Sequence, residues 1–156
     1  MVETKNQQFV KWLEESKANV AITITLKQGL PLGNGRFEPL TDHKAIQTAR
    51  LIGERITKGL VGTRGYQKRG ERLPFLVFLE GDRFTRKHFH IAAVRPPETS
   101  FSEYEAFARS KIEKLNWVYN QHVFKEITGI RGWIKYNLKN GIDAFIPEAS
   151  ILPIIP

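Results

Sequence analysis

Two histidines stand one residue apart in the segment 87–94 (KHFHIAAV), whose remaining residues are mostly those of an apolar strand. Successive side chains of a strand point to opposite faces, so His88 and His90 share one face and Phe89 lies on the other. Imidazole nitrogens are common metal ligands, and two of them side by side can hold one ion. An ordinary pair of surface histidines has the same spacing. A metal site therefore requires a third ligand and a group that reacts beside it.

The third candidate ligand is Glu80, which ends the apolar segment 73–80 (LPFLVFLE). Only a short polar turn separates it from the histidines, so we expect 73–80 and 88–94 to form adjacent antiparallel strands with the carboxylate beside both rings. Two histidines and one acid leave coordination positions open, which is typical of a catalytic divalent ion. A glutamate at the end of a strand more often only contacts solvent, so the case for Glu80 as a metal ligand depends on the two histidines.

A candidate reacting group lies in the last expected helix, 129–140. At 100° per residue its large apolar residues share one broad sector that would pack on a sheet, whereas Tyr136 and Lys139 fall together on another side. Gly132 precedes Tyr136 by one turn and leaves room for a nucleic-acid backbone to approach the phenol. A tyrosine at the edge of an apolar face is also a common packing anchor, so this helix alone does not decide the question.

Positive charge is concentrated around the histidines. The net charge is +8, and residues 64–95 carry 8 basic and 3 acidic side chains, a balance of +5. Such a surface suits a polyanion, DNA or RNA, although it would also simply keep a protein soluble. Base contacts are expected from the polar strand face and from the loops 28–40 and 62–72. The candidate nucleic-acid contacts are Thr23, Thr25, Lys27, Arg64, Lys68, Arg69, Arg72, Arg83, Arg86, Lys87 and Lys135.

Hydrophobic periodicity predicts an α+β fold, with helices largely on one face of one antiparallel sheet and the other face open to a ligand. The dipeptide Asn34-Gly35 predicts a hairpin turn. Helices are expected over 5–17, from Thr41 or Asp42 to about 60, over 100–115 and over 129–140. Strands are expected over 20–27, 73–80, 88–94 and 117–126.

Several classes of protein are excluded by what the chain lacks. It has no cysteine, so disulfides, thiolate zinc sites and cysteine nucleophiles are ruled out. It has no apolar run of roughly 20 residues and no signal-peptide pattern, so we expect no membrane association and an intracellular protein. It has no phosphate-binding GxxxxGK[ST] loop, so it encodes no helicase motor. Its 156 residues fit a single domain, 1–156.

Three segments, in this order, resemble the motifs of the HUH endonucleases. They are the apolar strand 22–26 (ITITL), the pair 88–90 (HFH) with Glu80 upstream, and 136–141 (YNLKNG). The similarity is greatest to the replication initiators of rolling-circle replicons of geminiviruses, circoviruses and small plasmids. Their third motif is Tyr-x-x-Lys, often followed by Asp-Gly, where this chain has Asn140-Gly141. The motifs span most of the chain.

The resemblance implies a five-stranded antiparallel sheet of the RNA-recognition or ferredoxin-like type with the histidines on a central strand. It implies Mn²⁺ or Mg²⁺ held by Glu80, His88 and His90. Tyr136 would be the nucleophile, assisted by Lys139, in sequence-specific nicking and rejoining of single-stranded origin DNA through a 5′-phosphotyrosyl intermediate. Such a nuclease works with a helicase, either a separate protein or a further domain of a longer initiator. It would act in a prokaryotic cytoplasm or, for a eukaryotic virus, in the nucleus.

Two alternatives remain open from the sequence. A relaxase or transposase of the same superfamily shares the nicking chemistry, but relaxases commonly carry three histidines, whereas this chain offers two and a glutamate. A non-catalytic module that binds single-stranded nucleic acid would use the same basic sheet, with Phe78, Phe84 and Phe89 as stacking groups.

Overall fold

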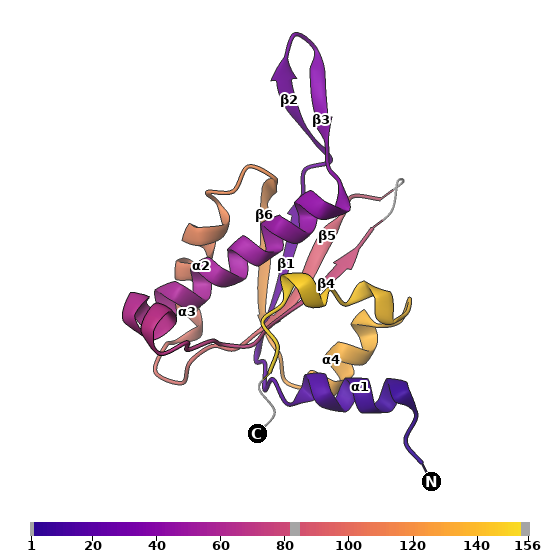
Figure 1. Ribbon diagram of the computed structural model, residues 1–156, viewed down its shortest axis with the longest axis vertical. Coiled ribbons are helices and arrows are strands. Elements are labelled where there is room, and N and C mark those ends of the chain that lie inside the picture. Colours follow the sequence, from indigo (N-terminus) through magenta and orange to yellow (C-terminus); the bar gives the residue numbers. More distant parts are fainter. Residues whose placement is uncertain (1, 82–84, 154–156) are drawn as a thin grey trace.

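The computed structural model describes residues 2–81 and 85–153 and has an α+β fold. Four strands form the main sheet, which is antiparallel throughout and has the order β4-β5-β1-β6 (Figure 1). Their bounds are β1 Val20–Leu26, β4 Phe75–Glu80, β5 His88–Ala93 and β6 Val118–Glu126. The four strands expected from periodicity are thereby confirmed. β5, which carries the histidines, is an inner strand between β4 and β1.

The main sheet has four strands in the described part of the chain, where the family resemblance implied five. The C-terminal segment lies along the outer edge of β4, but its strand pairing there is limited to two isolated bridges, Phe78 to Phe145 and Phe75 to Ile151. Between them, Val77 accepts a hydrogen bond from the N–H of Ile146 and donates one to the hydroxyl of Ser150. Between these bridges the chain makes the short 3₁₀ turn η2 (Pro147–Ala149). Proline has no backbone N–H to donate to a ladder, so this segment does not become a continuous strand.

Helices cover both faces of the sheet, which corrects the expectation that they lie largely on one. α2 (Asp42–Lys68) and α3 (Phe101–Ile112) pack on one face, whereas α1 (Lys5–Glu14) and α4 (Ile130–Asn137) pack together on part of the other (Figure 1). The side chain of Thr41 caps α2 by accepting a hydrogen bond from the N–H of Lys44. α2 continues beyond the expected end near residue 60, through a kink at Gly62, which has a φ of 79°.

Strict alternation along β1 separates the two faces. Val20, Ile22, Ile24 and Leu26 are fully buried against α2 and α3, whereas Ala21, Thr23 and Thr25 on the other face are partly exposed. A second, smaller core covers part of that other face and joins α1 and α4 to the sheet. Its buried members are Val10, Leu13, Ala18, Leu76, Phe78, Ala92, Ile134 and Phe145. The polar remainder of this face is where the candidate site lies.

A two-stranded hairpin, β2 (Gly29–Gly33) and β3 (Arg36–Pro39), projects from the body as a separate small sheet (Figure 1). Its turn confirms the prediction from Asn34-Gly35, because both residues have positive φ, 53° and 72°. That conformation suits the two-residue turns that match the twist of a hairpin.

Candidate metal and nucleic-acid site

Strand register brings the three candidate ligands to one face. Glu80 on β4 is directly opposite His88 on β5, which in turn pairs with Thr25 on β1. One row further along, His90 lies between Phe78 and Thr23. Because directly paired residues point to the same face of a sheet, the carboxylate and both imidazoles meet there, as the sequence predicted.

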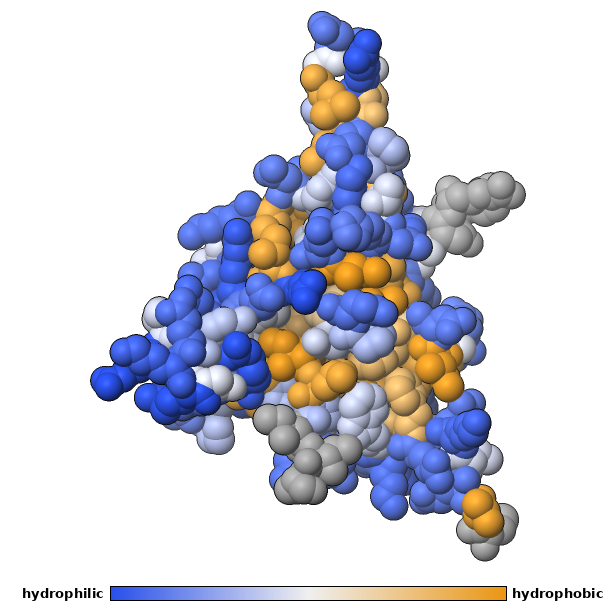
Figure 2. Space-filling model, viewed as in Figure 1, coloured by the Kyte–Doolittle hydropathy of each residue, from blue (hydrophilic) through white to orange (hydrophobic). Residues whose placement is uncertain are grey.

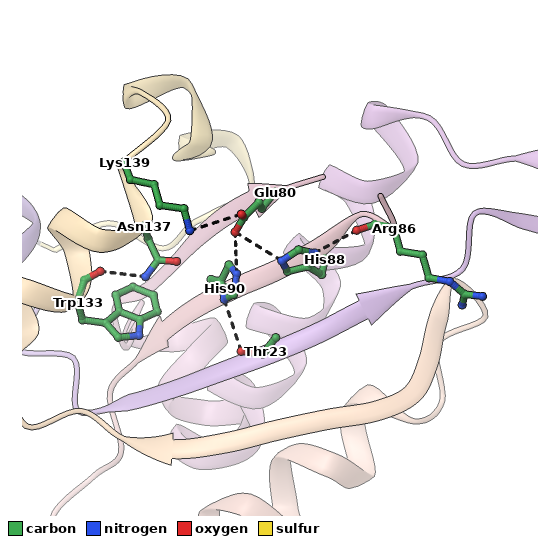
Figure 3. A network of polar contacts seen from close by, with 8 residues as sticks. All are labelled: Thr23, Glu80, Arg86, His88, His90, Trp133, Asn137 and Lys139. Carbon is green, nitrogen blue, oxygen red and sulfur yellow. Dashed lines mark hydrogen bonds and ion pairs between the residues drawn. The ribbon is translucent and has the colours of Figure 1, made fainter. Parts of the chain in front are cut away.

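The side chains converge closely. The Nε2 atom of His90 lies 2.9 Å from Oε2 of Glu80, and that of His88 lies 3.5 Å from the same oxygen (Figure 3). The two rings are nearly perpendicular, with centroids 4.7 Å apart. One ligand atom from each residue can be chosen so that all three lie within 4.8 Å of one another. Such a cluster could hold one metal ion, with room for further ligands.

Both histidines are oriented through their other ring nitrogen. Nδ1 of His88 lies 3.0 Å from the backbone carbonyl oxygen of Arg86, to which it can donate a hydrogen bond. Nδ1 of His90 lies 3.5 Å from the hydroxyl of Thr23. At 2.9 Å the contact of His90 Nε2 with Glu80 is itself a hydrogen bond in which the ring donates. Binding of a metal ion to Nε2 would require the proton of each ring on Nδ1, where the carbonyl oxygen of Arg86 or the hydroxyl of Thr23 could accept it, as is typical of metal-binding histidines. Thr23, expected to contact DNA, thus lies next to His90.

Local charges favour the metal-binding protonation states. Burial opposes ionisation of Glu80, but Lys139, His90 and His88 together outweigh it and hold the pKa of the carboxyl below its usual value. Burial, aided by the neighbouring His88, lowers the pKa of His90 although Glu80 acts in the opposite direction. The carboxylate is therefore charged and the His90 imidazole neutral at neutral pH, as metal ligands must be.

Helix α4 and the turn after it place Tyr136 and Lys139 near this cluster; the helix ends at Asn137, earlier than the expected residue 140, so Lys139 lies in the turn. Ile134 is fully buried and Trp133 packs edge-on against Phe78, with ring centroids 5.4 Å apart, so the expected apolar sector does face the sheet. Nζ of Lys139 lies 3.6 Å from Oε1 of Glu80 and 4.0 Å from the centre of the Tyr136 ring. The hydrogen bond to Tyr136, then the charge of Glu80, raises the pKa of Lys139.

Tyr136 is 63% exposed, and Lys139 links it to Glu80. The phenol does not line the cleft beside the cluster; it stands at the rim, where solvent and a large substrate have access. The side chain is thus accessible although it is hydrogen-bonded to Lys139, and its helix is fixed by packing on the opposite side.

A cleft of roughly 430 Å³ opens beside the cluster, lined by Glu80, His90, Lys139 and further polar residues, among them Asn137 and Asp143, which the sequence argument did not identify. Asn137 donates a hydrogen bond from its amide nitrogen to the carbonyl oxygen of Trp133 at 2.9 Å, and its own carbonyl oxygen points toward His90 (Figure 3). Asp143, in the 3₁₀ turn η1 (Ile142–Ala144), supplies an acid close to the position where the family often has one. No periodicity or spacing singled out either residue.

Three of the expected basic contacts lie at this end of the sheet. Lys27 follows β1, Lys87 pairs with Asp42, and the guanidinium of Arg86 lies 4.6 Å from the centre of the Tyr119 ring. The hydrogen bond and positive charge of Arg86 lower the pKa of Tyr119. Thr25 lies on the open face, opposite His88.

The other basic residues are not gathered around the histidines, so the expected single cluster does not form. α2 begins near the site, and at about 1.5 Å per residue it carries the chain roughly 30 Å away before its kink. Arg64, Lys68, Arg69 and Arg72 lie at that distant end of α2, which packs on the opposite face of the sheet. Lys135 lines a separate small hollow between α1 and α4, and Arg83 lies outside the described residues.

Two of the three proposed stacking residues are inaccessible. Phe78 and Phe89 are each 1% exposed and belong to the two cores, because each ring points to a face of the sheet that is covered at its position. Phe84 lies outside the described residues. A nucleic-acid base cannot stack on Phe78 or Phe89 in this fold.

Comparisons with protein families, with curated proteins and with solved structures give no match to this chain. The likeness to the HUH endonucleases therefore rests on the three motifs. No helix in the described part of the chain is long and apolar enough to cross a bilayer.

Proposed function

We propose that this protein is a metal-dependent endonuclease that nicks and rejoins single-stranded DNA at a replication origin, through a covalent bond to Tyr136. The observation that carries the proposal is the position of Lys139, which follows α4 and contacts both Glu80 of the Glu80–His88–His90 cluster and the ring of Tyr136 in α4. A metal cluster alone, or a Tyr-x-x-Lys helix alone, would have many explanations. Nicking chemistry requires both together, a charge-stabilising centre and a nucleophile beside it.

The donor set suits a hard or borderline divalent ion such as Mn²⁺ or Mg²⁺, for which Glu80, His88 and His90 would be the protein ligands. When bound, the ion supplies Lewis-acid stabilisation of the negative charge on the phosphate oxygens. Two imidazoles and one carboxylate leave positions for those oxygens and for water.

The bond changes proposed for Tyr136 are balanced. Its oxygen attacks the scissile phosphorus and becomes joined to the 5′ side of the DNA, while the bond from phosphorus to the 3′ oxygen breaks. The phenol proton is lost to solvent, and the 3′ oxygen takes up a proton to become a free hydroxyl. One phosphate ester replaces another, so the same groups can run the reaction in reverse and rejoin the strand.

Lys139 contributes positive charge to this step. It contacts the Tyr136 ring on one side and Glu80 on the other, so its ammonium can stabilise the phenolate oxygen and later the phosphotyrosyl group. Because it forms no covalent bond, Lys139→Ala should slow the reaction, by roughly 10- to 100-fold, without abolishing it.

The test is a search for the covalent adduct. Wild-type protein is incubated with Mn²⁺ or Mg²⁺ and a pool of single-stranded oligonucleotides with a degenerate centre, and adducts are resolved on a denaturing gel and sequenced. Adducts should form only with metal and should vanish in Tyr136→Phe. Tyr119→Phe is the matched control, because it removes a hydroxyl from the same end of the sheet and should leave the adduct intact.

An adduct that persists in Tyr136→Phe would assign the nucleophile to another residue. Absence of any adduct in wild type, together with retained DNA binding, would favour a non-catalytic single-strand binding module. A relaxase or transposase would form the same adduct and differ in the sequence it selects. If the selected nick lies in a hairpin or inverted repeat and is cut in single-stranded form, this assay does not distinguish a replication initiator from a relaxase or transposase. The genes that neighbour this one would then decide between them. In replication initiation the partner would be a helicase that separates the strands after the nick.

A further inference from the structure

The hairpin arm, residues 29–39, exposes more apolar surface than a free hairpin should. Phe37 is 68% exposed and Leu32 is 61% exposed, and Figure 2 shows apolar atoms on the projecting arm. A two-stranded hairpin is only marginally stable in water, and leaving large apolar side chains in solvent forgoes the free energy of burying them. Both residues therefore indicate that the arm contacts another molecule.

The arm is attached at the metal end of the sheet by both of its stems. β2 begins four residues after Thr25, which pairs with His88. β3 leads into Asp42 at the start of α2, which pairs with Lys87. The backbone N–H of Leu40 donates to the carbonyl oxygen of Gln28 and closes the base of the arm. The arm therefore projects from the end of the sheet at which the cluster lies.

A lysine of α2 fixes the arm in this direction. Nζ of Lys44 lies 2.7 Å from a carboxylate oxygen of Glu38 and 3.1 Å from the carbonyl oxygen of Pro39, both in β3. These contacts hold the root of the arm against the body, so a ligand bound at the tip would be placed at a defined distance from the site. A strand of five residues gives the arm a length of about 16 Å from its root to its tip.

The charges around the arm favour a polyanion as its partner. The arm's single acid, Glu38, is neutralised by Lys44, and Asp42 at its base is neutralised by Lys87. Arg36 stands next to Phe37, and Lys27 and Arg86 lie near the root. An apolar protein surface would gain nothing from these cations, whereas a nucleic acid offers phosphates to them and a flat base to the ring.

We propose that the arm grips single-stranded nucleic acid, with Phe37 stacked on an unpaired base and Arg36, which points to the other face of the hairpin, on a backbone phosphate. This inference deepens the proposed function by adding a binding contact several nucleotides away from the scissile phosphate. It also assigns to Phe37 the stacking role that the buried Phe78 and Phe89 cannot have. Only an unpaired strand presents the face of a base, so the contact selects single strands over duplex.

The test measures binding without cleavage. In the Tyr136→Phe background and without metal, anisotropy of a labelled degenerate single-stranded oligonucleotide gives the affinity. Phe37→Ala should weaken binding about 10- to 100-fold, as expected for the loss of one stacked base, and Phe37→Trp should retain it. Leu51→Ala, which truncates an exposed apolar residue on α2, is the matched control and should have no effect. Binding to a duplex of the same sequence should be changed little by Phe37→Ala.

The salt dependence separates the two contacts. Phe37→Ala should leave the slope of log affinity against log salt unchanged, whereas Arg36→Ala should reduce it by about 0.7, the loss of one phosphate contact on a single strand. Thermal unfolding should be the same in Phe37→Ala and its parent, because the ring is exposed and supports no packing in the monomer. A Phe37→Trp protein should also show quenching of the added tryptophan when oligonucleotide is bound.

Equal affinities in Phe37→Ala and its parent would overturn the proposal. So would a loss of self-association on sedimentation, with DNA affinity unchanged, because that result would make the arm a contact between two copies of this chain. Failure of the nicking chemistry gives a different pattern. If wild type forms no adduct but Phe37→Ala still loses affinity, the arm proposal stands. If Phe37→Ala binds normally and Tyr136 still forms adducts, only the arm proposal falls.

Discussion

Gly132→Ala should make the protein more stable and the nuclease slower. Gly132 lies inside α4, is exposed, and has open space around the position of an added Cβ, with no atom within 4 Å. Alanine in a helix interior is favoured over glycine by about 0.5–1 kcal/mol. For a chain of this size that gain raises the melting temperature by about 1–4 °C. The same methyl would stand one turn before Tyr136, where side chains tilt toward the helix N-terminus and a DNA backbone would have to pass.

The reactive geometry is sensitive, since a displacement of about 1 Å can cost 100-fold in rate, so adduct formation should slow by about 10-fold or more. Calorimetric unfolding gives the stability, and single-turnover adduct formation gives the rate. Gly129→Ser is the matched control: it adds a capping hydroxyl to the start of the same helix, also into open space, and should gain a few tenths of a kcal/mol without slowing the reaction. If Gly132→Ala is stabilised but forms the adduct at an unchanged rate, DNA does not pass over this turn of α4. Destabilisation would refute the local structural argument.

Three further outcomes are expected. His90→Ala should weaken Mn²⁺ binding by at least about 10-fold in calorimetry with circular dichroism unchanged, and wild-type affinity should fall as pH drops below about 6.5, because the ligands must be deprotonated. Affinity for single-stranded DNA should fall steeply between about 50 and 200 mM salt, since Lys27, Arg86 and Lys139 at the site end of the sheet would each contact a phosphate. A flat dependence in fluorescence titrations would contradict this. Burial, with Arg109 nearby, lowers the pKa of His122 in the folded protein. As the pH falls, the unfolded chain therefore binds a proton at His122 before the folded protein does. The free energy of unfolding, measured with urea, should keep its full value above about pH 6.5 and decline below it. His122→Gln should flatten that decline, and an unchanged slope would contradict the burial argument.

The parts of the fold that the sequence predicted are those with strong local patterns. Strict alternation in 20–26 (VAITITL) gave a half-buried strand, and Asn34-Gly35 gave a hairpin turn, because each depends only on nearby residues. The alternation of His88 and His90, joined to Glu80 by a short turn, also predicted the cluster. The register of two adjacent antiparallel strands joined by a short turn has little freedom. The sequence positions of these three residues were therefore enough to predict that their ligand atoms meet.

The features that were missed depend on tertiary packing. The sheet is covered on both faces because α1 and α4 share a core with Leu76 and Ala92, and nothing in the local pattern of those strands distinguishes a second covering layer from solvent. The basic residues at the end of α2 are close in sequence to the histidines, yet a long helix carries them away. Asn137 was hidden inside an amphipathic helix, and its importance depends on which way its amide points.

The half-covered face also explains how one short helix can serve both folding and chemistry. Ile134 and Trp133 fix α4 on the sheet at the row of Phe78, and the next row along is Glu80 with His88. The candidate site therefore lies at the boundary between a dry core and water. Burial on one side keeps His90 neutral, as a metal ligand requires, while the open side admits a charged phosphate that a closed core would exclude. The apolar contacts of α4 thus set the position of the polar groups on its other side.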